Sequence, residues 1–202
     1  MAGGTATGRF PNGLLSFDLD VGTEIVRIHW QAKGPVFFGP SPGDPPANRF
    51  DAPGSEFRVL YAALQLPGAF VETVLRRPGR VMRRSETDLR AATRLALQRP
   101  LVLAKVMDEG LQWHGVHAGE ISIDDYAPSR QLALDFHTAF PVLDGLAYRS
   151  RYNNGQICFA LFDRVEAGSM VPAGQMDFHS HPAVIDDLMA LYGAVFDTSG
   201  TP

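Results

Sequence analysis

The feature that most constrains the fold is a β-hairpin in the last third of the chain. Residues 146–151 (LAYRSR) and 156–164 (QICFALFDR) are two strand-like segments separated by a short polar turn. That turn contains Asn153-Asn154-Gly155, and asparagine and glycine tolerate the positive φ angles of tight hairpins. The pattern therefore predicts an antiparallel pair of strands.

Other segments predict further strands and helices. Residues 23–30 (TEIVRIHW) alternate two sets of side chains with the period of a strand, and residues 58–63 form a second short strand. Pro67 suits the first turn of a helix that continues to Leu75 and ends at Pro78-Gly79. Further strands are expected at 93–98 and 101–106, and helices at 107–114, 126–140 and 184–196. Residues 119–125 form a strand end or a helix lead-in, with Asp124 or Asp125 as N-cap. The segments 33–55 and 165–182 are expected to be irregular.

The order of these segments indicates the fold class. About six short strands occur without regular alternation with long helices, so a doubly wound parallel sheet is not expected. With 202 residues, of which 45% are hydrophobic, the chain can bury a core as a single domain. We therefore expect an α+β domain with a mixed sheet, organised as a flexible arm (1–13), a main domain (14–175) and a C-terminal helix and tail (176–202).

Charge and cysteine content exclude several classes of protein. The net charge of −4 provides no general attraction to nucleic acid or an anionic membrane, so direct nucleic-acid binding is not expected. Cys158 is the sole cysteine, which excludes a disulfide framework, and its apolar surroundings predict a buried, inert thiol. No apolar run is long enough for a membrane span and no signal peptide is visible, so a cytoplasmic protein is expected.

The common catalytic motifs are absent. The sequence has no GxGxxG, GxxxxGK[ST], HExxH, GxSxG or CxxC pattern. Two histidine pairs, His114/His117 and His179/His181, have no third ligand nearby in sequence. We therefore expect no metal site and interpret these histidines as exposed or locally hydrogen-bonded.

One stretch combines three functional groups within a loop, a strand and a helix. Arg49 precedes the strand at 58–63, Tyr61 lies in it, and Glu72 lies on the helix that follows. An arginine, a phenol and a carboxylate facing one cleft would suit an anionic sugar-phosphate substrate. Arg27 and His29 are also candidates because they share the polar face of the strand at 23–30.

Each candidate also has a purely structural interpretation. Glu72 could pair with Arg76 one helical turn away, and Arg27 could belong to a cross-strand ion pair. Arg49 could tie its loop to the surface, and Tyr61 could be a core residue with a satisfied hydroxyl. The arginine-rich segment 76–99 is either a solvated basic edge or a docking surface for an acidic partner or phosphates.

Taken together, these residues resemble the RES-domain proteins, the toxins of RES–Xre toxin–antitoxin pairs. That family is named after an arginine, a glutamate and a serine, and the resemblance covers roughly residues 24–164. The matching positions are Arg27 in VRIHW, Glu72 in AFVETVLRR and Ser150 in LAYRSR, supported by Arg49-Phe50 in NRFDAPG, Tyr61 in VLYAA and the hairpin.

The resemblance implies a fold similar to the ADP-ribosyltransferases of diphtheria-toxin type and NAD⁺ as substrate. It implies cleavage of the nicotinamide–ribose bond by phosphorolysis or hydrolysis, with inorganic phosphate as a candidate co-substrate. An Xre-type antitoxin would block the active site in a hetero-oligomer. One alternative is a toxin that transfers ADP-ribose to a metabolic enzyme, and a second is a non-catalytic module that binds a nucleotide or a partner.

The same residues suit the chemistry that the resemblance implies. Breaking this bond builds positive charge on the anomeric carbon, as in glycoside cleavage, and a fixed carboxylate such as Glu72 stabilises that charge. Arg27 and Arg49 could grip phosphate oxygens, Tyr61 could stack on nicotinamide or hydrogen-bond nearby, and Ser150 could bind a ribose hydroxyl or the amide. Arg27, Tyr61 and Glu72 are thus the expected catalytic residues, and Arg27, Arg49, Tyr61 and Ser150 the expected NAD⁺-binding residues.

Overall fold

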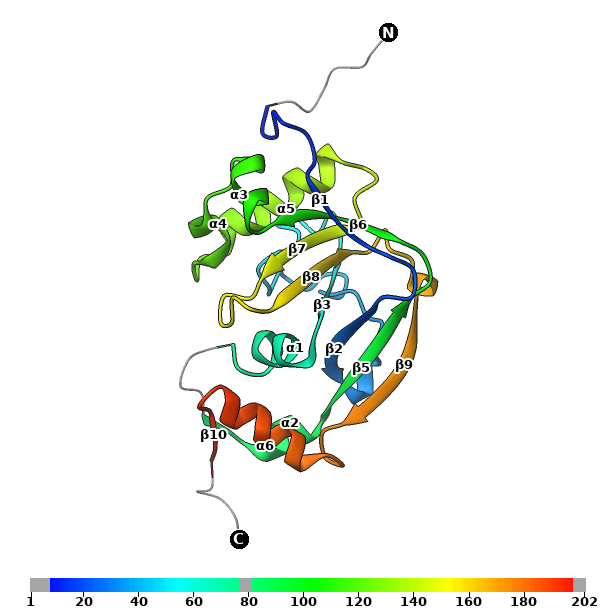
Figure 1. The fold of residues 1–202 in the computed structure, drawn as a ribbon, viewed down its shortest axis with the longest axis vertical. Coiled ribbons are helices and arrows are strands. Elements are labelled where there is room, and N and C mark those ends of the chain that lie inside the picture. The colour runs from blue at the N-terminus through cyan, green and yellow to red at the C-terminus, as the bar shows by residue number, and fades with distance from the viewer. Residues whose placement is uncertain (1–7, 77–80, 198–202) are drawn as a thin grey trace.

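The computed structural model describes residues 8–76 and 81–197 and shows an α+β domain built on one curved sheet (Figure 1). The sheet is mixed: β6 and β7 are parallel and all other neighbours in it are antiparallel. The fold class expected from the sequence is therefore confirmed. In spatial order the strands are β1 (Ser16–Leu19), β6 (Leu101–Val106), β7 (Gly145–Arg149), β8 (Ile157–Phe162), β3 (Val59–Ala63), β2 (Glu24–Trp30), β5 (Arg90–Leu97) and β9 (Met170–Asp177).

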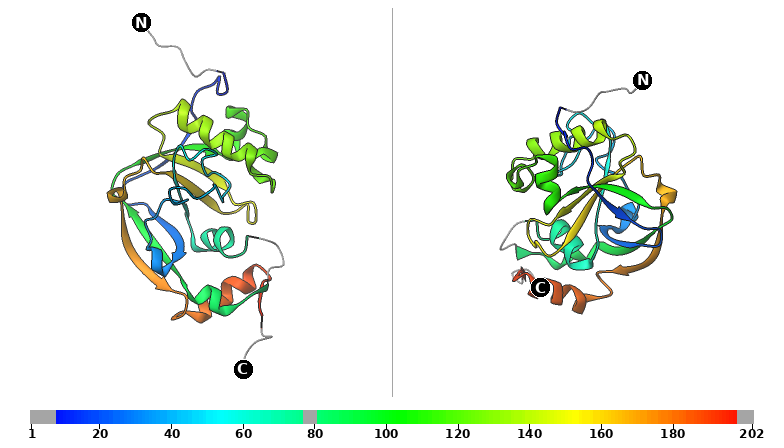
Figure 2. Two further views of the ribbon diagram at one scale, coloured as in Figure 1. Left: turned by 180° about the vertical axis from the view of Figure 1, so that it is seen from behind. Right: turned by 45° about the horizontal axis from the view of Figure 1, so that its top comes forward.

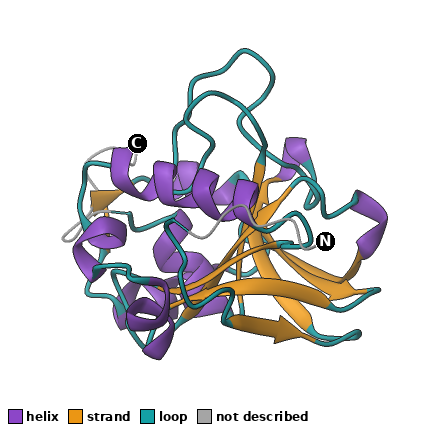
Figure 3. Ribbon diagram, turned by 90° about the horizontal axis from the view of Figure 1, so that it is seen from above, coloured by secondary structure: helices purple, strands orange, loops and turns teal. Residues whose placement is uncertain are grey.

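The helices gather mainly on one side of the sheet, as the view from above shows (Figure 3). One group covers the strands around β7, and another lies at the far end of the molecule with a small second sheet (Figures 1 and 2). The first group is α3 (Glu109–His114), α4 (Ala118–Ser122) and α5 (Ala127–Ala139); the second is α2 (Arg84–Asp88) and α6 (Pro182–Leu191) with β4 (Val81–Met82) and β10 (Val195–Phe196). No helix of the described residues is long and apolar enough to cross a membrane.

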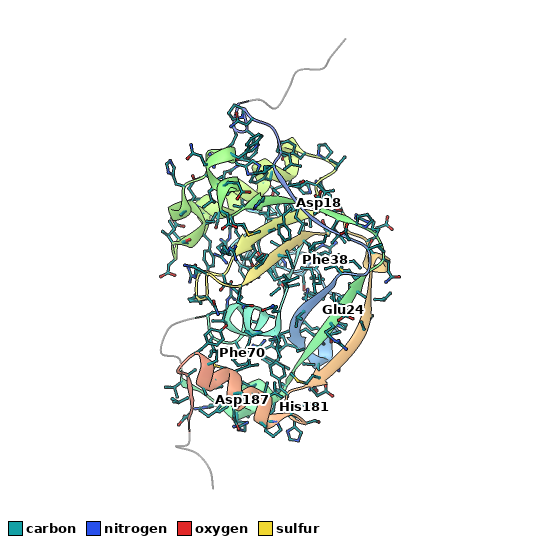
Figure 4. All side chains as sticks on the ribbon, in the orientation of Figure 1. Asp18, Glu24, Phe38, Phe70, His181 and Asp187 are labelled. Atoms are coloured by element: carbon teal, nitrogen blue, oxygen red, sulfur yellow. The ribbon has the colours of Figure 1, made fainter. Side chains whose placement is uncertain are left out.

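The helix α1 (Leu66–Thr73) lies against the middle of the sheet, close to the helix predicted at 67–75. Pro67 occupies its first turn, and Gly68 lets it approach the sheet, because a Cβ there would lie 3.0 Å from Gln156 and 3.3 Å from the Ala63 side chain. Phe70 is fully buried and meets Phe178 at 6.2 Å between α1 and the α6 end of the molecule (Figure 4). This close packing fixes the face of α1 that carries Glu72.

The strands β2 and β3 are joined at one point only. Val26 opposite Ala63 is their sole aligned pair, whereas β2 pairs with β5 along its whole length. Beyond that pair the two strands diverge, and the segment 34–58 enters the opening. Phe38 of this segment packs against a cluster of buried apolar residues that includes Leu60 and Phe159, so the segment is an ordered loop (Figure 4).

Several expectations about local structure are corrected. Residues 165–182 are not irregular, because they form the 3₁₀ turn η2 (Ala167–Ser169) and the strand β9. The short strand β1 was not predicted at all, and the strand expected at 93–98 begins earlier, at Arg90. Residues 118–122 form the helix α4, and the N-cap position of α5 belongs to Tyr126, although the Asp125 carboxylate accepts the Ala127 N–H at 2.9 Å.

The C-terminal helix is shorter than expected. It spans Pro182–Leu191 rather than 184–196, and Gly193, with φ of 61°, reverses the chain before β10. A left-handed glycine is a common helix terminator, and here it frees Val195 and Phe196 to pair with β4.

The described part of the N-terminal segment is packed. Phe10 is 2% exposed and stacks on Phe136 of α5, and Arg9 pairs with Glu120 and Asp135. The flexible arm expected at 1–13 therefore does not extend over residues 8–13, and residues 1–7 lie outside the described residues.

Candidate functional site

The opening between β2 and β3 forms a cavity of ≈ 310 Å³. Arg27, Arg49, Tyr61 and Glu72 all line it, although they come from β2, the loop before β3, β3 and α1. Four of the five predicted site residues therefore share one cavity, and the fifth, Ser150, lies directly behind Glu72.

The Glu72 carboxylate is held by three hydrogen bonds. Oε1 accepts from Ser150 Oγ at 2.7 Å and from the Arg151 N–H at 3.2 Å, and Oε2 accepts from Arg49 Nη2 at 3.1 Å. The side chain is 18% exposed, so it is fixed but still reachable from the cavity. Each carboxylate oxygen can accept two hydrogen bonds, so Oε2 keeps one acceptor position for a ligand hydroxyl. The alternative pairing with Arg76 is not formed, because Arg76 donates to Asn48 instead.

Ser150 positions Glu72. It is fully buried, and its hydroxyl donates to Glu72 while accepting the N–H groups of Tyr152 and Asn153. The hairpin turn is thereby fastened to α1. Direct contact between Ser150 and NAD⁺ stays a prediction.

Arg49 is 6% exposed, and other residues of the protein surround its guanidinium group. Besides Glu72, it donates to the Ile121 carbonyl at 2.8 Å and its guanidinium lies 4.7 Å from the centre of the Tyr148 ring. Burial alone would lower the pKa of Arg49, but its interactions with Tyr148, Glu72 and Tyr61 outweigh burial and raise that pKa. Arg49 is therefore a permanent cation that orients the Glu72 carboxylate, and its grip on the NAD⁺ phosphates stays a prediction.

The Tyr61 hydroxyl has both of its roles occupied. It donates to Asp51 Oδ1 and accepts the Phe50 N–H, each at 2.9 Å. Burial and the neighbouring Asp51 raise the pKa of Tyr61 well above its usual value, so the phenol stays neutral. The ring lines the cavity, and the hydroxyl holds the loop that carries Arg49.

Arg27 differs from Arg49 because part of its guanidinium has no partner. Nε and Nη1 are shielded from solvent, and within residues 8–76 and 81–197 no atom accepts their hydrogen bonds. Burial lowers the pKa of Arg27 to about 10, so the group is still charged at neutral pH. The cross-strand ion pair considered above is thus not formed by these two atoms. A shielded cation with unused donors, lining a cavity, is a ready receptor for an anion.

Comparison with known families decides the affiliation of the chain. A family model described as "RES domain" matches residues 24–181, well over half of the sequence. The chain belongs to the RES-domain family.

One solved structure supports the same fold for this RES domain. It is the crystal structure of the M. tuberculosis MbcT–MbcA toxin–antitoxin complex, with a TM-score of 0.65 and 13% sequence identity over 92% of this chain and 97% of that one. At this identity the similarity concerns the fold alone. No curated protein sequence matches the chain.

Two further residues of the RES domain border the cavity, His29 and Arg151. His29 is buried between the Trp30 carbonyl and Thr93, and burial lowers its pKa. Arg151 donates to the Ile123 carbonyl and to Asp124, so it ties the hairpin turn to the segment after α4. Both side chains thus support the walls of the cavity.

The arginine-rich segment of the RES domain is bound largely by its own chain. Arg77 and Arg80 lie outside the described residues, and Arg83 is exposed. The contacts of the others are Arg76 with Asn48, Arg84 with Asp186, Arg90 with Trp30, Arg94 with Glu24 and Arg99 with Asp144. Its use as a docking surface stays a prediction.

Two other kinds of site are relevant to the described part of the RES domain, a metal site and a reactive thiol. Among the described residues, no three histidine, cysteine, aspartate or glutamate side chains are placed to hold a metal ion. Cys158 is buried, as expected, and burial raises the pKa of its thiol.

Sequence reasoning missed Asp51. This fully buried carboxylate accepts the Ala47 N–H at 2.9 Å, the Asn48 N–H at 2.7 Å and the Tyr61 hydroxyl. An aspartate that closes a turn after a Pro-rich stretch is a recognisable signal, since Asp side chains often bind nearby backbone N–H groups.

Proposed function

We propose that this RES-domain protein is the toxin of a toxin–antitoxin pair and an enzyme that cleaves the nicotinamide–ribose bond of NAD⁺. One observation carries the proposal. Glu72, fixed by three hydrogen bonds, lines the same cavity as Arg27, whose Nε and Nη1 lack partners among the described residues. An orienting carboxylate and an unused cation are the two groups that a pyridine dinucleotide requires.

The charge of the cavity favours an anionic ligand. Among the described residues that line it, six are cationic, and Glu72 is the sole carboxylate. The cations are Arg27, Lys33, Arg49, Arg76, Arg90 and Arg151. A pyrophosphate would be attracted strongly to such a site, since phosphate oxygens pair well with arginine forks.

Glu72 would act on the ribose at the reacting carbon. As the carbon–nitrogen bond breaks, positive charge builds on the anomeric carbon and its ring oxygen, and the electron pair leaves with nicotinamide. Nicotinamide departs neutral, so no general acid is needed. The open acceptor position on Glu72 Oε2 can take a ribose hydroxyl and hold the sugar while the carboxylate stabilises the developing charge.

The acceptor is inorganic phosphate or water. Phosphate attack on the anomeric carbon would give a phosphorylated ADP-ribose and nicotinamide, whereas attack by water would give ADP-ribose, nicotinamide and a proton. The positive lining favours phosphate, because a bound nucleophile avoids much of the entropic barrier of a free one. The enzyme is thus an NAD⁺ phosphorylase or glycohydrolase.

An antitoxin is the partner that this function requires. The similarity to the toxin–antitoxin complex supports such a partner, and an Xre-type protein that covers the mouth of the cavity would keep NAD⁺ out. The protein should arrest bacterial growth when expressed alone and be tolerated when the antitoxin is co-expressed. Normal growth with unchanged cellular NAD⁺ at high expression would contradict the proposal.

Incubation of the pure protein with NAD⁺ tests the reaction. Products would be weighed by mass spectrometry in phosphate-free buffer and across a phosphate titration, with Glu72→Gln as the inactive reference. Release of nicotinamide with free ADP-ribose species supports the proposal, and phosphate dependence distinguishes phosphorolysis from hydrolysis. ADP-ribose attached to protein would instead indicate a transferase, and unchanged NAD⁺ a non-catalytic binding module.

A further inference from the structure

A cluster of aromatic and cationic side chains lies at the end of the cavity away from Glu72. The Trp30 ring lines the cavity and is 39% exposed, and the Arg90 guanidinium lies 3.9 Å from its centre. Nearby, Lys33 lies 5.0 Å from the centre of the Phe37 ring, and both residues also line the cavity. The bond-breaking step described above uses none of these four side chains, although Lys33 and Arg90 contribute to the positive charge of the cavity.

Strand register places this cluster far from the catalytic carboxylate. One row across the sheet joins Val26, Ala63, Cys158 and Tyr148. Trp30 lies four residues beyond this row along β2, whereas Ser150, which binds Glu72, lies two residues beyond it in the opposite direction. At ~3.4 Å per residue, the two ends are separated by roughly 20 Å along the strands.

Arg27 lies between the two ends. It is one residue beyond the same row in the direction of Trp30, and both side chains line the cavity although residues three apart on a strand project to opposite faces. A ligand that reaches Glu72, Arg27 and Trp30 together must therefore be longer than a single nucleoside and carry its negative charge near the middle. A dinucleotide joined by a pyrophosphate has this shape and charge distribution.

We infer that the Trp30–Arg90 pair binds the adenine base of the dinucleotide, with Arg27 at the pyrophosphate and Glu72 at the nicotinamide riboside. The inference rests on the proposed function, since the bond that breaks must lie at Glu72 and the other base must then lie at the opposite end. Nucleobases stack on indole faces and on arginine planes, and an indole already paired with a guanidinium is a rigid platform for such stacking.

The two tryptophans allow a direct test by fluorescence. Trp113 on α3 donates to the Gly13 carbonyl and does not line the cavity, so Trp113→Phe leaves Trp30 as the sole reporter. This variant would be titrated with AMP, with ADP-ribose and with nicotinamide mononucleotide. AMP and ADP-ribose should change the Trp30 emission, and nicotinamide mononucleotide should not.

Affinity measurements complete the test. By calorimetry, Trp30→Ala should weaken ADP-ribose binding by about tenfold, Trp30→Phe should weaken it less, and Trp113→Phe should leave it unchanged. A response of Trp30 to nicotinamide mononucleotide but not to AMP would overturn the assignment, as would ADP-ribose binding with no change at Trp30 or in the Trp30→Ala affinity. Those results would leave the proposed function standing, whereas failure of both NAD⁺ and ADP-ribose to bind would overturn both.

Discussion

At the scale of single residues, Glu72 is the group whose charge and fixed orientation matter most. Glu72→Gln keeps the shape of the side chain, but its NH₂ group must then face hydrogen-bond donors and cannot accept from them. These donors are Arg49 on one side, or Ser150 and the Arg151 N–H on the other. We expect NAD⁺ turnover to fall at least a hundredfold, since a preorganised group at the reacting centre supplies ~3–4 kcal/mol. Turnover would be measured beside Glu166→Gln, an exposed control. Activity within tenfold of the wild type would contradict the role of Glu72.

Arg27 should reduce stability while it enables binding. Its folded pKa of about 10 lies below the ordinary value of arginine, so the folded state holds the proton less tightly than the unfolded state. The destabilisation caused by burying the charged Arg27 guanidinium is therefore present in full at neutral pH and is relieved only as the pH rises above about 10. Arg27→Met should raise the free energy of unfolding by ~1–2 kcal/mol and abolish NAD⁺ binding. Urea unfolding and calorimetry would test this, with exposed Arg94→Met as control. A less stable variant would contradict the interpretation.

The sequence could identify these residues but not their pairing. Arg27, Arg49, Tyr61 and Glu72 line one cavity, as expected. Yet nothing in the spacing of two arginines along a chain shows that Arg49 contacts Glu72 while Nε and Nη1 of Arg27 lack a partner in the described structure. That choice depends on the shape of the loop around Arg49, which is a tertiary property.

At the scale of elements, the loop 47–51 depends on one buried carboxylate. Asp51 holds two backbone N–H groups and the Tyr61 hydroxyl, and in this way it fixes the direction of Arg49. Asp51→Asn replaces one acceptor oxygen by a donor, so it leaves either the Tyr61 hydroxyl or both backbone N–H groups without an acceptor. We expect a loss of ~1–3 kcal/mol in the free energy of unfolding and lower NAD⁺ turnover.

Thermal unfolding and turnover of Asp51→Asn would be compared with those of Asp44→Asn, an exposed position elsewhere in the segment 34–58. Tyr61→Phe removes the same contact from the other side. The double variant should therefore lose less than the sum of the single losses, and additive losses would contradict a shared network.

Some elements were predictable because their signals are local. The hairpin of β7 and β8 and the helix α1 follow from turn residues and apolar spacing. The strand β9 was missed because Pro172 and Gly174 interrupt its pattern, and an edge strand tolerates both. The end of α6 did have a signal, Gly193, which marks helix termini.

At the scale of the whole molecule, two buried histidines and one half-buried histidine should make stability depend on pH. Burial lowers the pKa values of His29, His114 and His137. As the pH falls, these histidines take up protons in the unfolded state before they do so in the folded state. Their contribution to the free energy of unfolding is therefore fully present above about pH 6.5 and is lost as the pH falls below it. His114 adds a specific reason, because its Nε2 accepts the Leu15 N–H and protonation ends that bond.

We expect the melting temperature to fall between pH 7 and pH 5, with each histidine contributing at most ~1.4 kcal/mol per pH unit. Differential scanning calorimetry at several pH values would measure the profile. His114→Gln should flatten it, because this variant removes one of the three titrating imidazoles. A flat wild-type profile over this range would contradict the prediction.

The fold class was predictable from composition and segment order, but the strand order was not. The parallel pairing of β6 with β7 requires the chain to cross over through α3, α4 and α5. The pairing of β5 with β9 likewise joins strands far apart in sequence. Local patterns carry no information about such contacts, which arise from the packing of the complete sheet.

The distance in sequence between Glu72 and Ser150 has a consequence for synthesis on the ribosome. The two residues are 78 positions apart, so until the later hairpin has been translated the carboxylate lacks two of its three hydrogen bonds and keeps only the one from Arg49. At ~5–20 residues per second, this gap lasts roughly 4–16 seconds. In a nascent or truncated chain that ends before Ser150, Arg49 alone holds Glu72, and under the proposed function such a chain would cleave NAD⁺ more slowly than the finished protein.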